Sequence, residues 1–366
     1  MIPQCSPQRA YERLQNPIQA RIAAVLRSGR YILGEEVRKF EEDFAAFCAA
    51  SRCIGCASGT DAIELVLRAL GIEHAHVATV ANTAVATAAA IERAGNQVCF
   101  ADIDPETLTM SPDSLEELFR TTSDIRAVVV VHLFGCPADM DALSLVAARH
   151  GVPVIEDCAQ AHGARWRNRR CGSIGAAGCF SFYPTKNLGA LGDGGAVVTS
   201  DPALADRIAA LRQYGWQERY ISAFPGINSR LDELQAAILS AKLPSLDRDN
   251  QLRRQIAAQY DEAVAANPAL RPPRSKEQAE PVYHQYVIRC EKRDELQKFL
   301  LERNIATAIH YPAPIHRQLA YAKRPPAVGL PETDRANSEI LSLPMFPELT
   351  DAEIAEVCAA LREFQA

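Results

Sequence analysis

The feature that most constrains the fold is a regular alternation of short apolar runs with segments of helical spacing. The runs are apolar throughout and do not alternate with polar residues, which predicts strands over 53–57, 98–101, 127–132 and 152–155. Helices are predicted over 35–50, 58–70, 82–94, 111–120 and 140–150. Strands that are apolar on both faces are typical of a sheet buried between two helical layers. We therefore predict an α/β fold with a mostly parallel central sheet flanked by helices.

The pattern changes after Pro244. Helices are predicted over 246–265, 293–304 and 351–364, with a proline-rich loop over 267–281 and a strand over 282–290. A chain of 366 residues is also long for a single core. We expect a large domain over residues 1–244 and a smaller C-terminal α+β domain over residues 245–366.

Charge and composition exclude several classes of partner. The formal net charge is −6, so no overall positive field attracts nucleic acid or a membrane surface. The first residues lack the apolar core of a signal peptide, and no apolar run approaches the ~20 residues of a membrane helix. We therefore expect a cytoplasmic protein whose 11 cysteines are reduced thiols. Cys53 and Cys56 have a CxxC spacing, but without a second pair or a histidine cluster we expect no metal site.

Lys186 is an unusually placed charge. It lies between the apolar run 178–182 and a stretch with four glycines over 189–195, where a solvated lysine is poorly suited. Asp157 ends the apolar strand upstream, although a strand-end aspartate also commonly caps the next helix. A lysine nucleophile together with a carboxylate that pairs with a pyridinium nitrogen is what pyridoxal phosphate (PLP) requires. Burial lowers the pKa of a lysine and so favours its use as a nucleophile and as a general base.

Anion-binding signals accompany this pair. Gly59 and Thr60 follow a predicted strand at the start of a helix, where backbone amides and the helix dipole favour a phosphate. Ser181 is a possible second donor, and Gln160 lies three residues after Asp157, where it can contact a bound ring. Each residue has an ordinary structural explanation by itself, such as a helix cap for Gly59 and Thr60 or a plain strand serine for Ser181. Their order and spacing together indicate a PLP site.

Over nearly its whole length the chain resembles the DegT/DnrJ/EryC1/StrS family of PLP-dependent sugar aminotransferases, which have the fold-type I aminotransferase scaffold. The resemblance lies in the segments 28–34, 57–62, 81–83, 131–135, 156–164, 181–187, 226–232 and 310–312. The motif around Lys186, Ser-Phe-Tyr-Pro-Thr-Lys-Asn, is highly specific. One departure is Ala84, because many members have an aromatic residue there that packs on the cofactor ring.

The resemblance implies a role for each matching residue. Lys186 would bind PLP as a Schiff base, Asp157 would pair with the pyridine nitrogen, and Gln160 would contact the ring. Gly59, Thr60 and Ser181 would hold the phosphate. Asn228 would complete this phosphate site from the other subunit, because the family members are homodimers with shared active sites. The residues implied for substrate binding are Tyr31, His162, Tyr183, Arg219, His310, Tyr311 and His316. By sequence alone Arg219 is equally well a solvated loop charge, and His316 a surface residue.

The implied reaction moves an amino group from L-glutamate, which leaves as 2-oxoglutarate, to a nucleotide-linked keto sugar. Pyridoxamine phosphate is the intermediate form of the cofactor. The residues of the motifs favour C3 of a dTDP-3-keto-6-deoxyhexose as the carbon that receives the amino group. The alternative is C4 of a UDP-, GDP- or dTDP-linked 4-keto sugar. A PLP-dependent sugar dehydratase is a further alternative, but related dehydratases have histidine in place of Lys186. A PLP-binding regulatory protein is the non-enzymatic alternative, although no DNA-binding module is evident.

Overall fold

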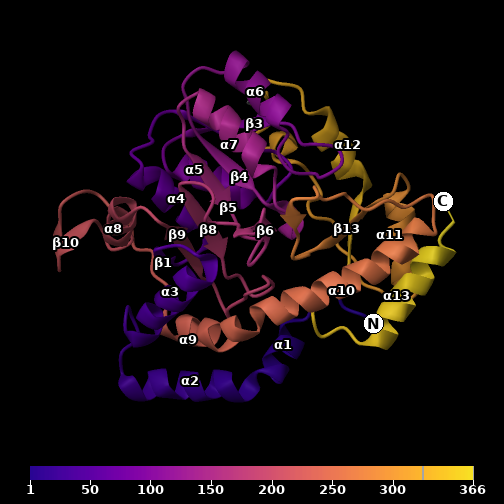
Figure 1. Ribbon diagram of the computed structural model, residues 1–366, viewed down its shortest axis with the longest axis horizontal. Helices are drawn as coiled ribbons and strands as arrows, with labels where there is room; N and C mark the ends of the chain where they lie inside the picture. Colours follow the sequence, from indigo (N-terminus) through magenta and orange to yellow (C-terminus); the bar gives the residue numbers. More distant parts are fainter. Residues whose placement is uncertain (324, 366) are drawn as a thin grey trace.

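A seven-stranded sheet forms the centre of the molecule in a computed structural model that describes residues 1–323 and 325–365 (Figure 1). Its order is β1-β9-β8-β5-β4-β2-β3. The strands are β1 (Arg52–Cys56), β2 (His76–Val80), β3 (Gln97–Ala101), β4 (Ile125–Val131), β5 (Val154–Asp157), β8 (Ala177–Ser181) and β9 (Gly195–Thr199). Only β9 runs against the others. The predicted mostly parallel sheet is therefore confirmed, while β2 and the antiparallel strand β9 were not predicted.

Helices cover both faces of this sheet. Successive strand residues point to opposite faces, so Ala127 and Val129 pack with one layer while Val128 and Val130 pack with the other. The first layer contains α4 (Gly59–Ala69), α5 (Val85–Arg93) and α8 (Pro202–Leu211). The second contains α3 (Glu35–Cys48), α6 (Pro112–Thr121), α7 (Met140–Arg149) and α9 (Glu233–Lys242). Burial on both sides explains why the strands are apolar throughout.

The parallel strands place the predicted site residues together. The carboxyl ends of β1, β4, β5 and β8 meet at one edge of the sheet, because these strands run in the same direction. Ser58 and Gly59 follow β1, Asp157 ends β5 and Ser181 ends β8. Ligands of such sheets bind outside the carboxyl ends of the strands.

A second apolar core lies at the C-terminal side of the molecule. It is built on the antiparallel pair β13 (Tyr286–Arg289) and β14 (Ile340–Leu343) and on α10 (Leu246–Ala265), α11 (Arg293–Glu302) and α13 (Asp351–Glu363). Ile2 from the N-terminus also belongs to this core. Residues between 315 and 336, including part of α12 (Pro331–Glu339), pack instead against the core of the central sheet. The division into domains at residue 244 stays a prediction.

The predicted strand 282–290 is shorter in the structure, and the reason bears on the site. Val282 and Gln285 donate backbone hydrogen bonds to Gly135 and Phe134, which follow β4, so this part of the segment bridges the two cores. Pairing with β14 begins only at Tyr286. Residues 282–285 are thereby directed to the edge of the sheet that carries Asp157.

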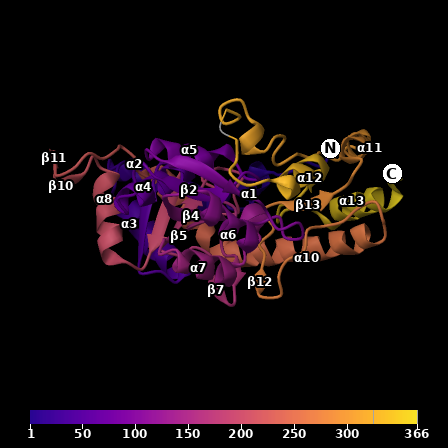
Figure 2. The same cartoon turned by 90° about the horizontal axis from the view of Figure 1, so that it is seen from above.

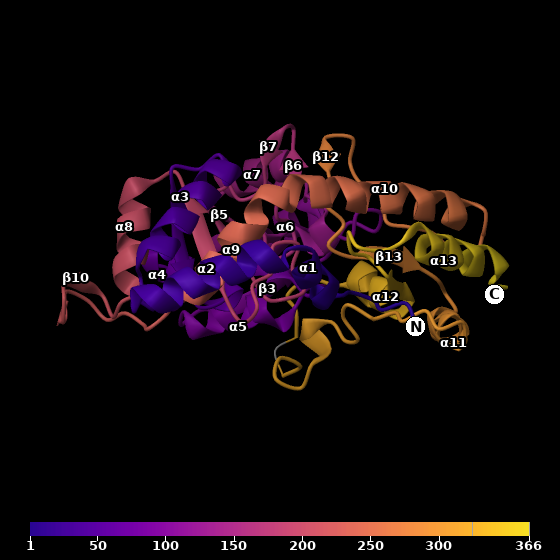
Figure 3. The same cartoon turned by 90° about the horizontal axis from the view of Figure 1, so that it is seen from below.

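Two further features were not predicted. The helices α1 (Pro7–Arg13) and α2 (Gln15–Ser28) begin the chain, and α2 lies beside α9 (Figure 3). The hairpin of β10 (Trp216–Glu218) and β11 (Ile221–Ser222) projects from the end of the molecule opposite α11 and α13 (Figure 2). Short strands also pair in a sheet of β6 (Arg165–Trp166), β7 (Arg169–Arg170) and β12 (Ala279–Glu280). Among the described residues no helix has the length and apolar character needed to span a membrane.

Candidate active site

A cavity of about 370 Å³ opens at the carboxyl edge of the sheet, a size typical of ligand sites. Nine of the residues predicted from the sequence line it: Gly59, Thr60, Asp157, Gln160, Ser181, Tyr183, Lys186, His310 and Tyr311. They come from the first turn of α4, from the ends of β5 and β8 and the loops that follow them, and from the segment before α12. Residues that are distant in the sequence thus converge on one cavity.

Lys186 lies in the loop that follows β8. Its backbone N–H donates to the carbonyl of Tyr183 at 2.8 Å, which holds the loop in a tight turn. Burial lowers the pKa of Lys186 to about 8, although the negative charge of Asp157 acts in the opposite direction. A lysine with this pKa is partly neutral near physiological pH, and only the neutral amine has the lone pair that a nucleophile or a base needs.

Asp157 is held at the end of β5 by two hydrogen bonds. Its Oδ2 accepts from the hydroxyl of Thr87 at 2.8 Å and its Oδ1 accepts from the backbone N–H of Ala159 at 3.1 Å. Burial raises the pKa of Asp157 even though these donors and Lys186 favour its ionised form. A positively charged group bound in the cavity would keep such a carboxyl ionised, and a protonated pyridine nitrogen is a group of this kind.

An anion-binding corner lies at the start of α4. The hydroxyl of Ser58 accepts from the N–H of Asp61 at 3.1 Å, and Gly59 and Thr60 occupy the first turn, whose amides have no partner within the helix. A Cβ at Gly59 would come within 2.7 Å of the Cβ of Ser181, so only glycine lets α4 and β8 approach this closely. The helix dipole and the Ser181 hydroxyl suit a phosphate. The lysine, the carboxylate and this corner together fit PLP.

Polar side chains from the C-terminal half close the cavity. Gln160 accepts a hydrogen bond from the N–H of Phe134 at 2.5 Å and donates to the hydroxyl of Tyr311 at 3.0 Å. His310 Nδ1 lies 2.8 Å from the hydroxyl of Ser342 on β14. Ala84 lines the cavity as a small side chain.

Five predicted residues do not line the cavity. Tyr31, Arg219 and Asn228 are exposed, and Arg219 lies beyond β10 with its guanidinium 4.9 Å from the ring centroid of Tyr220. His316 contacts Asp334 at 3.2 Å. His162 is fully buried against Phe180 and Phe182, and burial lowers its pKa to about 3. The roles of these five residues stay predictions.

Three cavity residues had no signal in the sequence: Thr87, His284 and Gln285. Thr87 lies in an alanine-rich helix where nothing marks it as a partner of Asp157. His284 and Gln285 lie in a segment whose apolar character predicted only a strand. Their place follows from the bridge between the two cores.

His132, Glu156 and Cys171 form a buried cluster with metal-ligand chemistry. His132 Nδ1 accepts from the backbone N–H of Ala138 at 3.1 Å, so its Nε2 carries the proton and donates to Glu156 at 3.0 Å. The Glu156 carboxylate also accepts from the backbone amides of residues 172, 174 and 175 at 2.7–2.8 Å. These bonds lower the pKa of Glu156 although burial alone would raise it. The cluster anchors β5 directly beneath Asp157.

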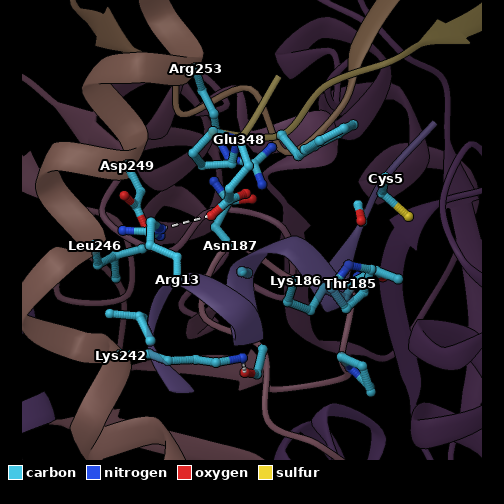
Figure 4. A pocket seen from close by; sticks show the side chains of 18 residues that line it. Cys5, Arg13, Thr185, Lys186, Asn187, Lys242, Leu246, Asp249, Arg253 and Glu348 are labelled. Carbon is cyan, nitrogen blue, oxygen red and sulfur yellow. Dashed lines mark hydrogen bonds and ion pairs between the residues drawn. The ribbon is translucent and has the colours of Figure 1, made fainter. Parts of the chain in front are cut away.

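A second cavity of about 50 Å³ shares Thr185 and Lys186 with the first (Figure 4). Its walls come from α1, α10 and the loop before α13. Arg13 contacts Asp249 at 2.6 Å and Glu348 at 3.0 Å, while Lys242 donates to the carbonyl of Gly189 at 2.6 Å. The lysine loop is thus packed against polar side chains on its far side.

Comparison with known proteins identifies the family. The sequence model of the DegT/DnrJ/EryC1/StrS aminotransferase family matches residues 12–362. A "Pleiotropic regulatory protein" of Geobacillus stearothermophilus is 44% identical over 99% of this chain and 98% of its own length. A "dTDP-3-amino-3,4,6-trideoxy-alpha-D-glucose transaminase" of Streptomyces venezuelae is also 44% identical, over 97% of this chain and 94% of its own.

The solved structures agree with this assignment and confirm the predicted fold. The crystal structure of S. venezuelae DesV in complex with a ketimine intermediate superposes with a TM-score of 0.96 at 43% identity and covers 99% of this chain and 98% of that one. The chain therefore belongs to the DegT/DnrJ/EryC1/StrS aminotransferase family, whose members are enzymes that use pyridoxal phosphate.

Proposed function

We propose that this enzyme transfers an amino group from L-glutamate to C3 of a dTDP-linked 3-keto-6-deoxyhexose. The observation that carries the proposal is the cavity in which Lys186, Asp157 and the first turn of α4 converge. The choice of sugar is supported by the similarity to the dTDP-3-amino sugar transaminase of S. venezuelae, which extends over almost the whole chain.

Different residues of the cavity have different roles in transamination. Bound PLP supplies an electron sink that stabilises negative charge at the carbon next to the nitrogen. Asp157 would favour a protonated pyridine nitrogen, which would strengthen that sink. The amides at the start of α4 and the hydroxyl of Ser181 would hold the phosphate and so fix the position of the reacting groups.

Lys186 Nζ moves the proton. In its neutral form the amine takes a proton from the amino-bearing carbon of the donor and later returns one to the carbon that receives nitrogen. A pKa of about 8 suits both directions, because the amine is readily protonated and readily deprotonated near neutral pH. Tyr183, His310 and Tyr311 supply hydroxyl and imidazole groups that can orient the sugar over this amine.

A substrate panel tests the proposal. We expect the purified enzyme, given L-glutamate, to aminate a dTDP-3-keto-6-deoxyhexose at least about 100-fold more efficiently than dTDP- and UDP-4-keto sugars, because misplacing the reacting carbon by about 1 Å costs a factor of this size. Product NMR locates the new amino group, and 2-oxoglutarate release reports the donor half of the reaction. Amination at C4 alone would overturn the C3 assignment but not the aminotransferase activity.

The name of the G. stearothermophilus relative raises the question of a regulatory role. In the present chain Lys186, Asp157 and the anion-binding corner all line one cavity, as catalysis requires. Lys186 is also the residue that the related dehydratases lack. The intact site therefore favours catalysis over both alternatives.

We propose further that the enzyme is a homodimer with shared active sites. Large apolar and aromatic side chains are exposed after α2, where Tyr31 is 49% exposed, and in the hairpin of β10 and β11, where Tyr220 is 73% and Ile221 61% exposed. Exposed patches of this kind mark protein interfaces. Arg219 and Asn228 are exposed as well and do not line the cavity of their own chain, which leaves them available to the site of a second copy.

Mixing two inactive variants tests this arrangement. Asn228→Asp would place a negative charge against the phosphate of the partner's site, while Lys186→Ala inactivates its own site. Random subunit exchange makes about half of the dimers mixed, with one subunit of each variant. Each mixed dimer has one intact site of two, so about a quarter of the wild-type activity should return. Absence of any restored activity, with exchange verified by mass spectrometry of tagged subunits, would contradict shared sites.

A further inference from the structure

A chain of side-chain hydrogen bonds leads from the N-terminal segment to the residue after Lys186. Gln4 donates to Gln285 at 2.5 Å, and the Gln285 amide lies 3.4 Å from His284 Nε2. His284 Nδ1 in turn lies 3.2 Å from Asn187 Oδ1. Asn187 Nδ2 donates to Asn250 on α10 at 2.9 Å, and Asn250 donates to the carbonyl of His162 at 2.8 Å. The chain connects the N-terminal segment, the segment just before β13, the lysine loop and α10.

The partners determine which nitrogen of His284 carries the proton. Asn187 Nδ2 also donates to the backbone carbonyl of Val282 at 3.1 Å, and a carbonyl oxygen only accepts. The amide oxygen of Asn187 must therefore be the atom that faces His284. Because that oxygen also only accepts, His284 Nδ1 bears the proton, and its Nε2 is the acceptor that faces the amide N–H of Gln285.

His284 lines the catalytic cavity and is 5% exposed. Burial lowers its pKa well below the ordinary value, and the positive charges of Lys186 and Arg253 lower it further, with smaller effects from His162 and His310. The imidazole is therefore neutral at all pH values at which the enzyme works. It acts as a fixed donor at one end and a fixed acceptor at the other, not as an acid or a base.

We propose that His284 is a positioning residue for Lys186: its Nδ1–H anchors Asn187 and thereby the lysine loop, and its Nε2 accepts from Gln285, which ties that loop to the N-terminal segment. The inference rests on the proposed role of Lys186 but not on the identity of the sugar. Asn187 lies immediately beside Lys186 on the α10 side of the loop (Figure 4), so its anchoring limits where the amine can go. No other described side chain is hydrogen-bonded to the amide oxygen of Asn187.

His284→Phe tests the role, because phenylalanine keeps the ring and loses both polar atoms. We expect kcat to fall about 10- to 100-fold, as for other supporting hydrogen bonds at reactive groups, while KM for glutamate changes by less than about threefold. Loss of the bond to Asn187 also releases the lysine loop and so changes the surroundings of the lysine nitrogen. The pH midpoint of the visible absorbance of the lysine-bound cofactor should therefore shift by about half a unit or more. This absorbance titration requires neither substrate.

Two variants distinguish positioning from general destabilisation. His284→Gln retains an N–H for Asn187 and should recover most of kcat. Tyr286→Phe removes a partly buried hydrogen bond to Asp261 (2.5 Å) two residues along the same segment, outside the catalytic cavity. It should lower the thermal unfolding temperature without moving the absorbance midpoint.

The proposal is overturned if His284→Phe keeps kcat and the midpoint of the wild type. It is also overturned if His284→Phe and Tyr286→Phe lose activity in proportion to their loss of thermal stability. If His284→Phe does not fold, His284→Gln and Gln4→Ala decide the matter by the same absorbance titration. Under the proposal Gln4→Ala, which releases the far end of the chain through Gln285, moves the midpoint in the same direction but less than His284→Phe. A failure of the wild type to bind the cofactor through Lys186 would instead refute the proposed role of that lysine.

Discussion

Lys186→Ala should reduce turnover by about four orders of magnitude, because a positioned proton-transfer group alone contributes up to about 10⁴-fold. The same substitution removes the amine that binds the cofactor covalently. The reaction of glutamate with the bound cofactor, followed by absorbance in a single turnover, measures the effect without the sugar. Because the chain belongs to a family of transaminases, we expect the loss of turnover in Lys186→Ala to affect both halves of the reaction.

The fold should tolerate this substitution. Burial holds the pKa of Lys186 at about 8, below that of a lysine in the unfolded chain. The folded state therefore disfavours the charged form of Lys186. The resulting loss of folding stability is complete at pH values below the pKa in the folded state and disappears as the pH rises above the pKa in the unfolded state. In the cofactor-free protein at pH 7, Lys186→Ala should unfold at the same temperature as the wild type or higher. Near-normal turnover by a well-folded variant would refute the role of the lysine.

Lys186→Arg is the matched control. It keeps a positive charge and similar length, but a guanidinium stays protonated at any pH at which the enzyme works. It should be as inactive as Lys186→Ala. Because the charge remains while the activity is lost, the pair would show that catalysis needs a lysine that can release its proton.

The catalytic centre was largely predictable because each of its main residues ends or follows a buried strand. Asp157 closes β5 and Ser181 closes β8, and the parallel order of the sheet brings their ends together. A local sequence window contains both the apolar strand and the polar residue after it. The lysine was visible for a similar reason, since its neighbouring apolar and glycine residues are adjacent in the chain.

The supporting residues were not predictable because their partners are distant in the sequence. Thr87 and Asp157 are 70 residues apart, and His284 and Asn187 are 97 apart. The segment before β13 has the composition of a strand, but tertiary bonds to Phe134 and Gly135 turn it toward the cavity. The hairpin of β10 and β11 was missed for a different reason, because its strands are only three and two residues long.

Asp157→Asn should separate stability from function more cleanly than any other substitution in the cavity. The asparagine side chain has the same shape, and it can still accept from the N–H of Ala159 and hydrogen-bond to Thr87. It cannot carry the negative charge that favours a protonated pyridine nitrogen. We expect kcat to fall by about 10²- to 10³-fold, the usual effect of removing one preorganised electrostatic partner.

The stability of the cofactor-free protein should change in the opposite direction. Burial raises the pKa of Asp157 in the folded state, so the ionised form costs stability at every pH above the folded pKa. Asparagine has no such cost, and cofactor-free Asp157→Asn should unfold at a higher temperature than the wild type at pH 7. At a pH well below the unfolded pKa of an aspartate the two proteins should converge, because both side chains are then neutral.

Thermal unfolding of both cofactor-free proteins between about pH 3 and pH 8, with turnover measured at pH 7, checks the two expectations together. An inactive variant that is also less stable at pH 7 would mean that Asp157 serves the fold, through Thr87 and Ala159, rather than the cofactor. An active variant would mean that a neutral partner suffices for the ring nitrogen. Only loss of activity with a gain in stability agrees with a carboxylate that is kept buried, at a cost to the fold, for a cationic ligand.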